Sequence, residues 1–274
     1  MKALSEKVFL KLDMPNSKDR KSDRDRILDK LKIKYKNVDM PYKITKDLYP
    51  KCRESNFEIT VTLVKRTYDW VVTRIEQGDK TDKNYGVCVD LGSTTVIMRL
   101  VDLNTGDIVV EEGCFNKQIS FGEDILNRIF YTRNSKEKLY EIHKATIDTF
   151  SELIDIITEK SKINSEDISV MTVAGNTTMI HFLLNIDPWT IFQMPYTPIF
   201  NHTGFISCDE IGIPINGYLY CFPSVANYLG GDIVSGVLFT EIYKQKELSA
   251  FIDIGTNGEL VIGNEEFLVA VAGA

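Results

Sequence analysis

Apolar and polar residues alternate along residues 56–63. The apolar side chains that share one face of this segment are Phe57, Ile59, Val61 and Leu63. Successive side chains of a strand point to opposite faces, so this period of two predicts a half-buried β-strand. Shorter apolar runs at residues 8–12 and 68–76 predict two further strands.

A helix is predicted after Ser22. This serine is a favoured N-cap residue, and the acidic Asp25 follows it at the spacing of a capping box. The apolar residues that then recur at helical spacing are Ile27, Leu28 and Leu31. Together with the three strands, this helix predicts a small α+β unit.

Residues 77–84 are polar and contain a glycine. Such a segment is typical of a connection between domains. We therefore place a domain boundary there, with a small α+β domain in residues 1–83 and a second domain in residues 84–274.

Strands and helices alternate in this second segment. The predicted strands cover residues 85–90, 95–103, 107–112, 167–173, 250–253 and 259–262. The predicted helices cover residues 122–132, 135–161, 176–184 and 230–243. Residues 189–218 show no steady period and are predicted to form loops and short strands. This alternation indicates an α/β layer fold with a mixed sheet.

The composition is that of a soluble globular protein, with 43% apolar and 26% charged residues among 274. The net charge of −7 argues against a nucleic-acid partner, because binding to a phosphate backbone needs a basic face. No apolar run approaches the roughly 18–20 residues of a membrane span. No signal peptide is readable, so we expect a cytoplasmic protein with no membrane partner.

The five cysteines are scattered along the chain, and no two stand at C-x-x-C spacing. This usage predicts reduced thiols rather than disulfides. It also argues against a zinc site or an iron–sulfur cluster held within this chain, since both usually need closely spaced ligands.

Two segments far apart in the chain share one sequence pattern. The pattern is an apolar residue, an aspartate, a second apolar residue, a glycine and then a serine or threonine. The two segments are residues 89–94 (VDLGST) and 252–257 (IDIGTN). Glycine lets the backbone turn without a side chain, so that backbone amides can point at phosphate oxygens. The predicted phosphate-binding residues are Gly92, Ser93, Thr94, Thr95, Gly255, Thr256, Asn257 and Gly258.

Asp90 and Asp253 precede these two glycine turns. A carboxylate repels a phosphate unless a cation lies between them, and hydrated Mg²⁺ is the natural choice. The pattern therefore predicts a clamp for a Mg–nucleotide, with Asp90 and Asp253 beside the metal. One copy alone is better explained as an ordinary strand–turn–strand, and the second copy favours the clamp.

The two loops and their order resemble the superfamily of actin, sugar kinases and heat-shock ATPases. The resemblance implies a ribonuclease-H-like ATPase fold with a mixed sheet and two loops facing across a cleft. It also implies a helix that brings an acidic residue near the attacking water. Asp232, at the head of the predicted helix 230–243, occupies that place, so Asp232, Asp253 and Asp90 are the candidate catalytic residues. The alternative for Asp232 is a helix N-cap.

Further motifs resemble the reductive activators of corrinoid proteins. They are residues 118–125 (QISFGEDI), 173–179 (VAGNTTM), 227–232 (NYLGGD) and 252–259 (IDIGTNGE). Residues 8–12, 22–23, 48–50, 53–54 and 60–63 resemble the middle domain of the same family.

This resemblance implies that ATP hydrolysis drives a one-electron reduction of an inactive cob(II)amide to cob(I)amide. The implied cofactors are ATP and Mg²⁺, and the implied partner is a corrinoid protein. The electron would enter through a ferredoxin-like [2Fe–2S] domain, whose cysteine spacing is absent here. The chain also stops within the apolar run 270–274, so it is expected to be a fragment that lacks that domain and the adenosine side of the ATPase. A homodimer is left open.

Two other functions stay open. The first is a small-molecule kinase of the same superfamily, with Asp232 as its catalytic carboxylate. The second is an interaction module without enzymatic activity, built on a nucleotide-binding fold. Residues 176–178 (NTT) begin a predicted helix and suit an anion site or an ordinary N-cap equally well.

Overall fold

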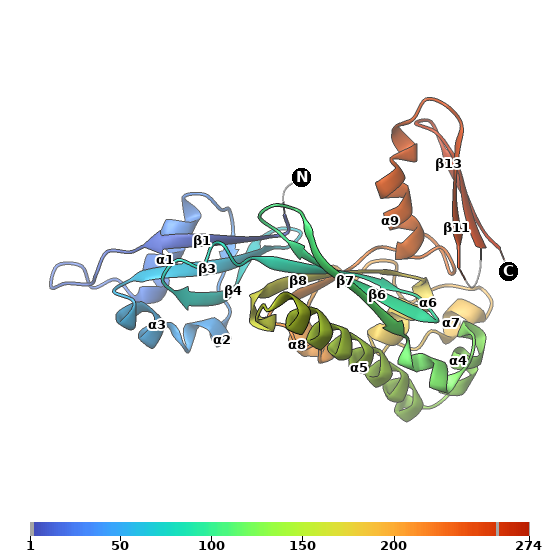
Figure 1. Ribbon diagram of the computed structural model, residues 1–274, viewed down its shortest axis with the longest axis horizontal. Helices are drawn as coiled ribbons and strands as arrows, with labels where there is room; N and C mark the ends of the chain where they lie inside the picture. Colours follow the sequence, from blue (N-terminus) through green and yellow to red (C-terminus); the bar gives the residue numbers. More distant parts are fainter. Residues whose placement is uncertain (1–2, 256–257, 274) are drawn as a thin grey trace.

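The computed structural model describes residues 3–255 and 258–273. These residues form three sheets, which follow one another along the chain and along the long axis of the molecule in Figure 1. The strand orders are β1-β3-β4-β2, β7-β6-β5-β8-β10-β9 and β11-β12-β13. None of the described helices is long and apolar enough to cross a membrane.

The first sheet carries three helices. Its strands are β1 (Ser5–Lys11), β2 (Val38–Asp39), β3 (Glu58–Lys65) and β4 (Trp70–Gln77). The helices are α1 (Asp23–Lys32), α2 (Tyr42–Thr45) and α3 (Leu48–Glu54). The predicted cap of α1 is confirmed, because the Ser22 hydroxyl accepts a hydrogen bond from the Asp25 amide. The apolar face of β3 packs against Ile27 and Leu31 of this helix in one core.

The prediction of a half-buried strand at residues 56–63 is wrong in one respect. Thr60 and Thr62, on the face expected to be polar, are also buried. The Thr60 hydroxyl donates to the Gly78 carbonyl (2.7 Å) and accepts from the Lys80 amide (2.9 Å). The segment that follows β4 therefore covers Thr60, whose burial is tolerated because its hydroxyl is hydrogen-bonded, whereas the buried Thr62 hydroxyl has no partner among the described residues.

The second sheet is mixed, as predicted. Its strands are β5 (Tyr85–Leu91), β6 (Thr95–Asp102), β7 (Ile108–Phe115), β8 (Ile168–Gly175), β9 (Phe205–Ser207) and β10 (Tyr218–Cys221). The central β8 is parallel to β5 and to β10, whereas the other pairs are antiparallel. The long helix α5 (Lys136–Ser161) lies along one face of this sheet and contacts β6 and β7 (Figure 1).

Shorter elements join these strands. They are α4 (Ile125–Thr132), α6 (Thr177–Leu183), α7 (Trp189–Phe192), α8 (Cys208–Ile211) and the 3₁₀ turns η1 (Lys117–Phe121) and η2 (Ser165–Asp167). The expected caps of α5 and α6 are confirmed, with Ser135 and Asn176 accepting from amides of the first turn. Residues 189–218, predicted as loops and short strands, contain β9 but also the two four-residue helices α7 and α8.

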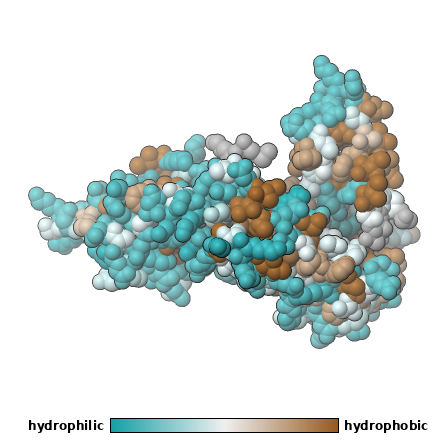
Figure 2. Space-filling model, viewed as in Figure 1, coloured by the Kyte–Doolittle hydropathy of each residue, from teal (hydrophilic) through white to brown (hydrophobic). Residues whose placement is uncertain are grey.

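The third sheet stands beside helix α9 (Gly231–Thr240), which is followed by the 3₁₀ turn η3 (Ile242–Lys244). Its strands are β11 (Ser249–Ile254), β12 (Gly258–Gly263) and β13 (Leu268–Ala272). Leu229, Ile233 and Val261 form a small core between helix and sheet. Val269 and Val271 of β13 are exposed. Figure 2 shows apolar surface, coloured brown, over this unit at the right of the molecule.

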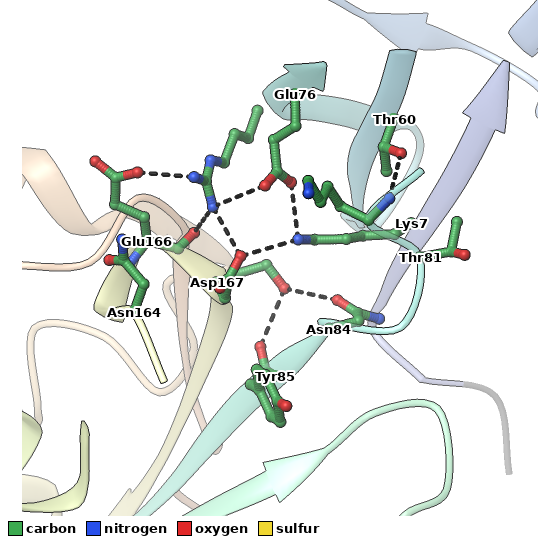
Figure 3. A network of polar contacts seen from close by, with 12 residues as sticks. Lys7, Thr60, Glu76, Thr81, Asn84, Tyr85, Asn164, Glu166 and Asp167 are labelled. Atoms are coloured by element: carbon green, nitrogen blue, oxygen red, sulfur yellow. Dashed lines mark hydrogen bonds and ion pairs between the residues drawn. The ribbon is translucent and has the colours of Figure 1, made fainter. Parts of the chain in front are cut away.

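A buried polar network joins the first two sheets (Figure 3). Lys7 of β1 contacts Glu76 of β4 and Asp167 at the start of β8, and Arg74 contacts the same two carboxylates. The two sheets nevertheless have separate apolar clusters. These clusters support the proposed boundary at residues 77–84, which remains a proposal.

Candidate functional site

A cavity of about 360 Å³ lies where the second and third sheets meet. Both predicted loops contribute to its wall. The lining residues are Asp90, Leu91, Gly92, Ser93, Thr94, Thr95, Ile125, Asn176, Asp232, Asp253, Ile254, Gly255 and Glu259. Thr256 and Asn257, two of the predicted phosphate-binding residues, lie outside the described residues, and Gly258 begins β12 next to the cavity.

The first loop is the turn between β5 and β6. Leu91 pairs with Val96 in antiparallel register, which leaves four residues to reverse the chain. A Cβ atom at Gly92 would lie 2.5 Å from the backbone oxygen of Thr95, far inside van der Waals contact. Only glycine permits this close approach, so the glycine of the sequence pattern is required by the shape of the turn.

The end of β8 brings Asn176 to the same edge. Leu91 of β5 and Gly175 of β8 are partners in parallel register, so the two strands deliver their next residues to one side of the sheet. The Asn176 side chain caps α6 and also donates to the Tyr228 carbonyl (3.1 Å). Thr177 donates to the Ala226 carbonyl (2.8 Å). These bonds hold the segment that leads into α9, and the N-cap interpretation of Asn176 is confirmed.

Asp232 lies in the first turn of α9, where Gly230 is the N-cap residue. The alternative that Asp232 is the N-cap is therefore wrong. Its Oδ1 accepts a hydrogen bond from the Ile233 amide (2.8 Å). Burial, with the nearby carboxylates of Glu259, Asp253 and Asp90 acting in the same direction, raises the pKa of this carboxyl to about 7, although the hydrogen bond from Ile233 opposes the shift. A carboxyl group with this pKa exchanges protons readily near neutral pH.

Four carboxyl groups surround the cavity. Burial and the charge of Asp253 raise the pKa of Asp90, and the same two causes raise the pKa of Glu259. Such crowding of like charges disfavours ionisation unless a cation relieves it. Within the described part of the chain, no group of three or more histidine, cysteine or acidic side chains is placed to hold a metal ion alone. This geometry suits a hydrated Mg²⁺ that shares its ligands with a phosphate, rather than a cage built of protein.

Glu259 is a cavity residue that the sequence analysis missed. It pairs with Asp253 across the β11–β12 hairpin. Like charges directly opposite each other destabilise a hairpin, so an aspartate and a glutamate flanking a glycine turn are themselves a signal of a charged site. Ile125 also lines the cavity. The signal in the sequence that could have identified it is its position in the 118–125 motif.

Residues 85–245 match the family model described as RACo middle region, and residues 1–82 match the model described as RACo linker region. The chain belongs to the RACo family. The two models meet between residues 82 and 85, next to the proposed domain boundary.

Two relatives of this RACo family chain are informative. It is 30% identical over 203 residues to the corrinoid activation enzyme RamQ of Eubacterium limosum. A solved structure of a reductive activator for corrinoid,iron-sulfur protein superposes with a TM-score of 0.90 at 36% identity and covers 98% of this chain. The predicted fold class is thereby confirmed as a mixed-sheet α/β fold after a small α+β unit, and it is the fold of this reductive activator.

The RACo family chain is much shorter than these relatives. The matched part is 73% of this chain but only 34% of RamQ, and 44% of the solved reductive activator. A third structure, a putative 2-dehydro-3-deoxygalactonokinase from Sinorhizobium meliloti, matches with a TM-score of only 0.38 at 9% identity. That likeness is too low to support a conclusion about activity.

Proposed function

We propose that this chain provides the linker region and the phosphate-holding part of an ATPase that energises the reduction of cob(II)amide to cob(I)amide on a corrinoid protein. The observation that carries the proposal is the single cavity that contains Asp90, Asp232 and Asp253 together with both glycine turns. It occurs in a chain whose relatives are a corrinoid activation enzyme and a reductive activator.

The residues of the first loop, Gly92, Ser93, Thr94 and Thr95, would bind phosphate oxygens from one side of the cavity. Gly255, Thr256, Asn257 and Gly258 would do so from the second loop. Asp90 and Asp253 would hold Mg²⁺ through water. The bound metal ion would neutralise the phosphates, which otherwise repel the four carboxylates.

Asp232 would act on the water that attacks the terminal phosphate. A general base works best when its pKa lies near the working pH. The pKa of Asp232 is raised to about 7 by burial and neighbouring carboxylates, so the group is poised to accept a proton from water. The hydrogen bond from the Ile233 amide to Oδ1 fixes the carboxyl group at the head of α9.

The electron-transfer partners belong to the proposal as well. All five cysteines are free, and Cys52, Cys208 and Cys221 are buried in apolar cores. We therefore expect a [2Fe–2S] cluster and its electron donor in a ferredoxin-like domain outside this chain. A corrinoid protein is the expected electron acceptor, the cytoplasm the expected compartment, and a homodimer an additional form to test.

The test uses a form of the protein that also carries the regions present in its relatives outside the matched part. This protein is mixed with a corrinoid protein in the cob(II) state and a low-potential reductant. We expect the cob(I)amide absorbance to appear with Mg-ATP and not with a non-hydrolysable analogue. Reduction that proceeds equally without ATP would contradict the proposal. ATP consumption that rises with a small metabolite, and not with the corrinoid protein, would instead support the kinase alternative.

A further inference from the structure

Asn116, directly after β7, makes two hydrogen bonds to the first loop and accepts a third from η1. Its backbone amide donates to the Thr94 carbonyl (2.8 Å), and its side-chain Nδ2 donates to the Gly92 carbonyl (2.9 Å). Its Oδ1 accepts from the Gln118 amide (3.0 Å). The residue is fully buried. One side chain and its backbone thus hold two carbonyl groups of the same four-residue turn.

These two bonds set the direction of the next amides. A trans peptide group is planar, so its N–H points opposite to its C=O. Holding the Gly92 carbonyl against Asn116 turns the Ser93 N–H away from Asn116. Holding the Thr94 carbonyl does the same for the Thr95 N–H. Ser93 and Thr95 both line the cavity, whose wall also includes Asp232 of α9 and Gly255 of the second loop.

A second layer of buried polar groups braces Asn116. Gln118 is fully buried, accepts from Nη1 of Arg128 (3.2 Å) and donates through Nε2 to the Thr146 hydroxyl (2.5 Å). Arg128 also donates through Nε to the Gly122 carbonyl (3.0 Å). These contacts connect α4, η1 and α5 behind the loop.

Arg128 is an unusual residue for such a place. Its side chain is fully buried, and its Nη2 has no hydrogen-bond partner among the described residues. The contacts of its other two nitrogens are to neutral groups, a carbonyl, an amide oxygen and the Met179 sulfur. A buried charge of this kind is costly for folding. The stability that Arg128 contributes therefore does not explain its burial behind the first loop.

We propose that Asn116, braced by Gln118 and Arg128, is a positioning residue that aims the Ser93 and Thr95 amides of the first loop at a bound phosphate. The role assigned to the loop rests on the proposed function. The orientation of the turn itself does not, because it follows from hydrogen bonds within the chain.

The first experiment measures hydrogen exchange of a peptide covering residues 92–95 in the nucleotide-free chain. Asn116→Asp has the same shape but lacks the Nδ2 donor, and we expect faster exchange of this peptide. Asn116→Ser, too short to reach Gly92, provides a second variant in case the carboxylate prevents folding. Gln118→Glu keeps an acceptor for Arg128 and is expected to leave exchange unchanged. Equal exchange in the wild type and both Asn116 variants would overturn the proposal.

The matched control is Thr149→Val. Thr149 is fully buried, and its hydroxyl accepts from the Lys117 amide (3.2 Å), one residue after Asn116, and donates to the Ala145 carbonyl (2.8 Å). The substitution removes hydrogen bonds next to Asn116 without touching the loop. We expect normal exchange at residues 92–95. Exchange as fast as in Asn116→Asp would mean that the loop responds to any nearby loss of stability, and would also overturn the proposal.

The second experiment measures nucleotide affinity in the protein with the regions its relatives carry. Asn116→Asp leaves the Gly92 carbonyl without its hydrogen-bond donor. We expect this loss to weaken Mg-ATP binding about tenfold. Adenosine, which lacks phosphates, should bind with unchanged affinity. Equal weakening for both ligands would contradict a role in aiming the loop. Failure of the wild type to bind Mg-ATP would contradict the proposed function, while the exchange measurement would still decide the role of Asn116.

Discussion

Lys7 Nζ lies 3.1 Å from Asp167 Oδ1, and this buried ion pair joins the first strand of the chain to the start of β8. The same ammonium group lies 2.8 Å from Glu76, and the Lys7 side chain is only 1% exposed (Figure 3). β8 runs from this joint to Gly175, whose neighbour Asn176 lines the candidate site. β8 therefore connects the ion-pair network between the first two sheets with the cavity.

Lys7→Met should destabilise the protein strongly. Removing one partner of a buried ion pair leaves an uncompensated charge and typically costs about 3–5 kcal/mol. Arg74 still contacts Asp167 (2.9 Å) and Glu76 (3.3 Å), so we expect a loss near the lower end of that range in urea unfolding. Lys11→Met is the control in the same strand, because the Lys11–Glu58 pair is exposed and such pairs contribute about 0–1 kcal/mol. An equal loss of unfolding free energy in the two variants would show that the Lys7 ion pairs contribute no more than an exposed pair.

Gly92→Ala should deform the first loop. The added Cβ would lie 2.5 Å from the Thr95 backbone oxygen, and a backbone atom cannot move aside cheaply. We expect weaker Mg-ATP binding and a lower melting temperature. Gly113→Ala on the neighbouring β7 is the control, since its Cβ would meet the Val96 oxygen at an ordinary 3.4 Å. A Gly92→Ala protein that binds and melts like the wild type would contradict the geometry of the turn.

Asp232→Asn should make the protein more stable at high pH. The pKa of Asp232 rises from 3.8 to about 7 on folding, so the folded state disfavours the ionised form. The wild type is therefore penalised above pH 7 and recovers stability as the pH falls from about 7 towards 4, when the folded protein binds a proton before the unfolded chain does. Thermal melts of both proteins from pH 8.5 to 5 test this. A difference in melting temperature between the two proteins that stays constant over this pH range would contradict the raised pKa of Asp232.

Asp90→Asn and Asp253→Asn should raise the Mg²⁺ concentration needed for ATP binding. Each removes one carboxylate that the proposed function places beside the ion, and we expect roughly a tenfold to hundredfold shift if one charge-assisted contact of about 1.5–3 kcal/mol is lost. Calorimetric titrations with ATP at several Mg²⁺ concentrations measure the shift. Asp102→Asn, at the opposite end of the same β5–β6 hairpin, is the control. An unchanged Mg²⁺ requirement in both site variants would remove these residues from the metal site.

Local signals in the sequence predicted the elements well. The caps at Ser22, Ser135 and Asn176 are made by side chains that bond amides two or three residues away, so the sequence contains all the information they need. The parallel pairing of β5 with β8 was different. It joins strands separated by a long helix, and the period of apolar residues does not reveal which strands are neighbours.

Long-range packing accounts for the errors and omissions. β3 has an alternating pattern, yet both of its faces are covered, because the segment after β4 folds back over Thr60. Glu259 and Ile125 were missed as cavity residues because the cavity that they line also takes residues from β5, β6 and α9, which are far from both in the chain. Asp232 was found by its order in the chain, but its raised pKa depends on burial by tertiary packing and, to a lesser extent, on three carboxylates brought from other elements.

The sequence by itself determined the two Asp-x-Gly loops, because a glycine turn after a buried strand is a local arrangement of a few consecutive residues. It also determined the resemblance to corrinoid-protein activators, since the motifs keep their order along the chain. Only the tertiary structure decided that the loops share one cavity with Asp232 and Glu259. Only the tertiary structure placed Asn116 behind the Gly92 turn, because that contact spans 24 residues and depends on how β6 pairs with β7.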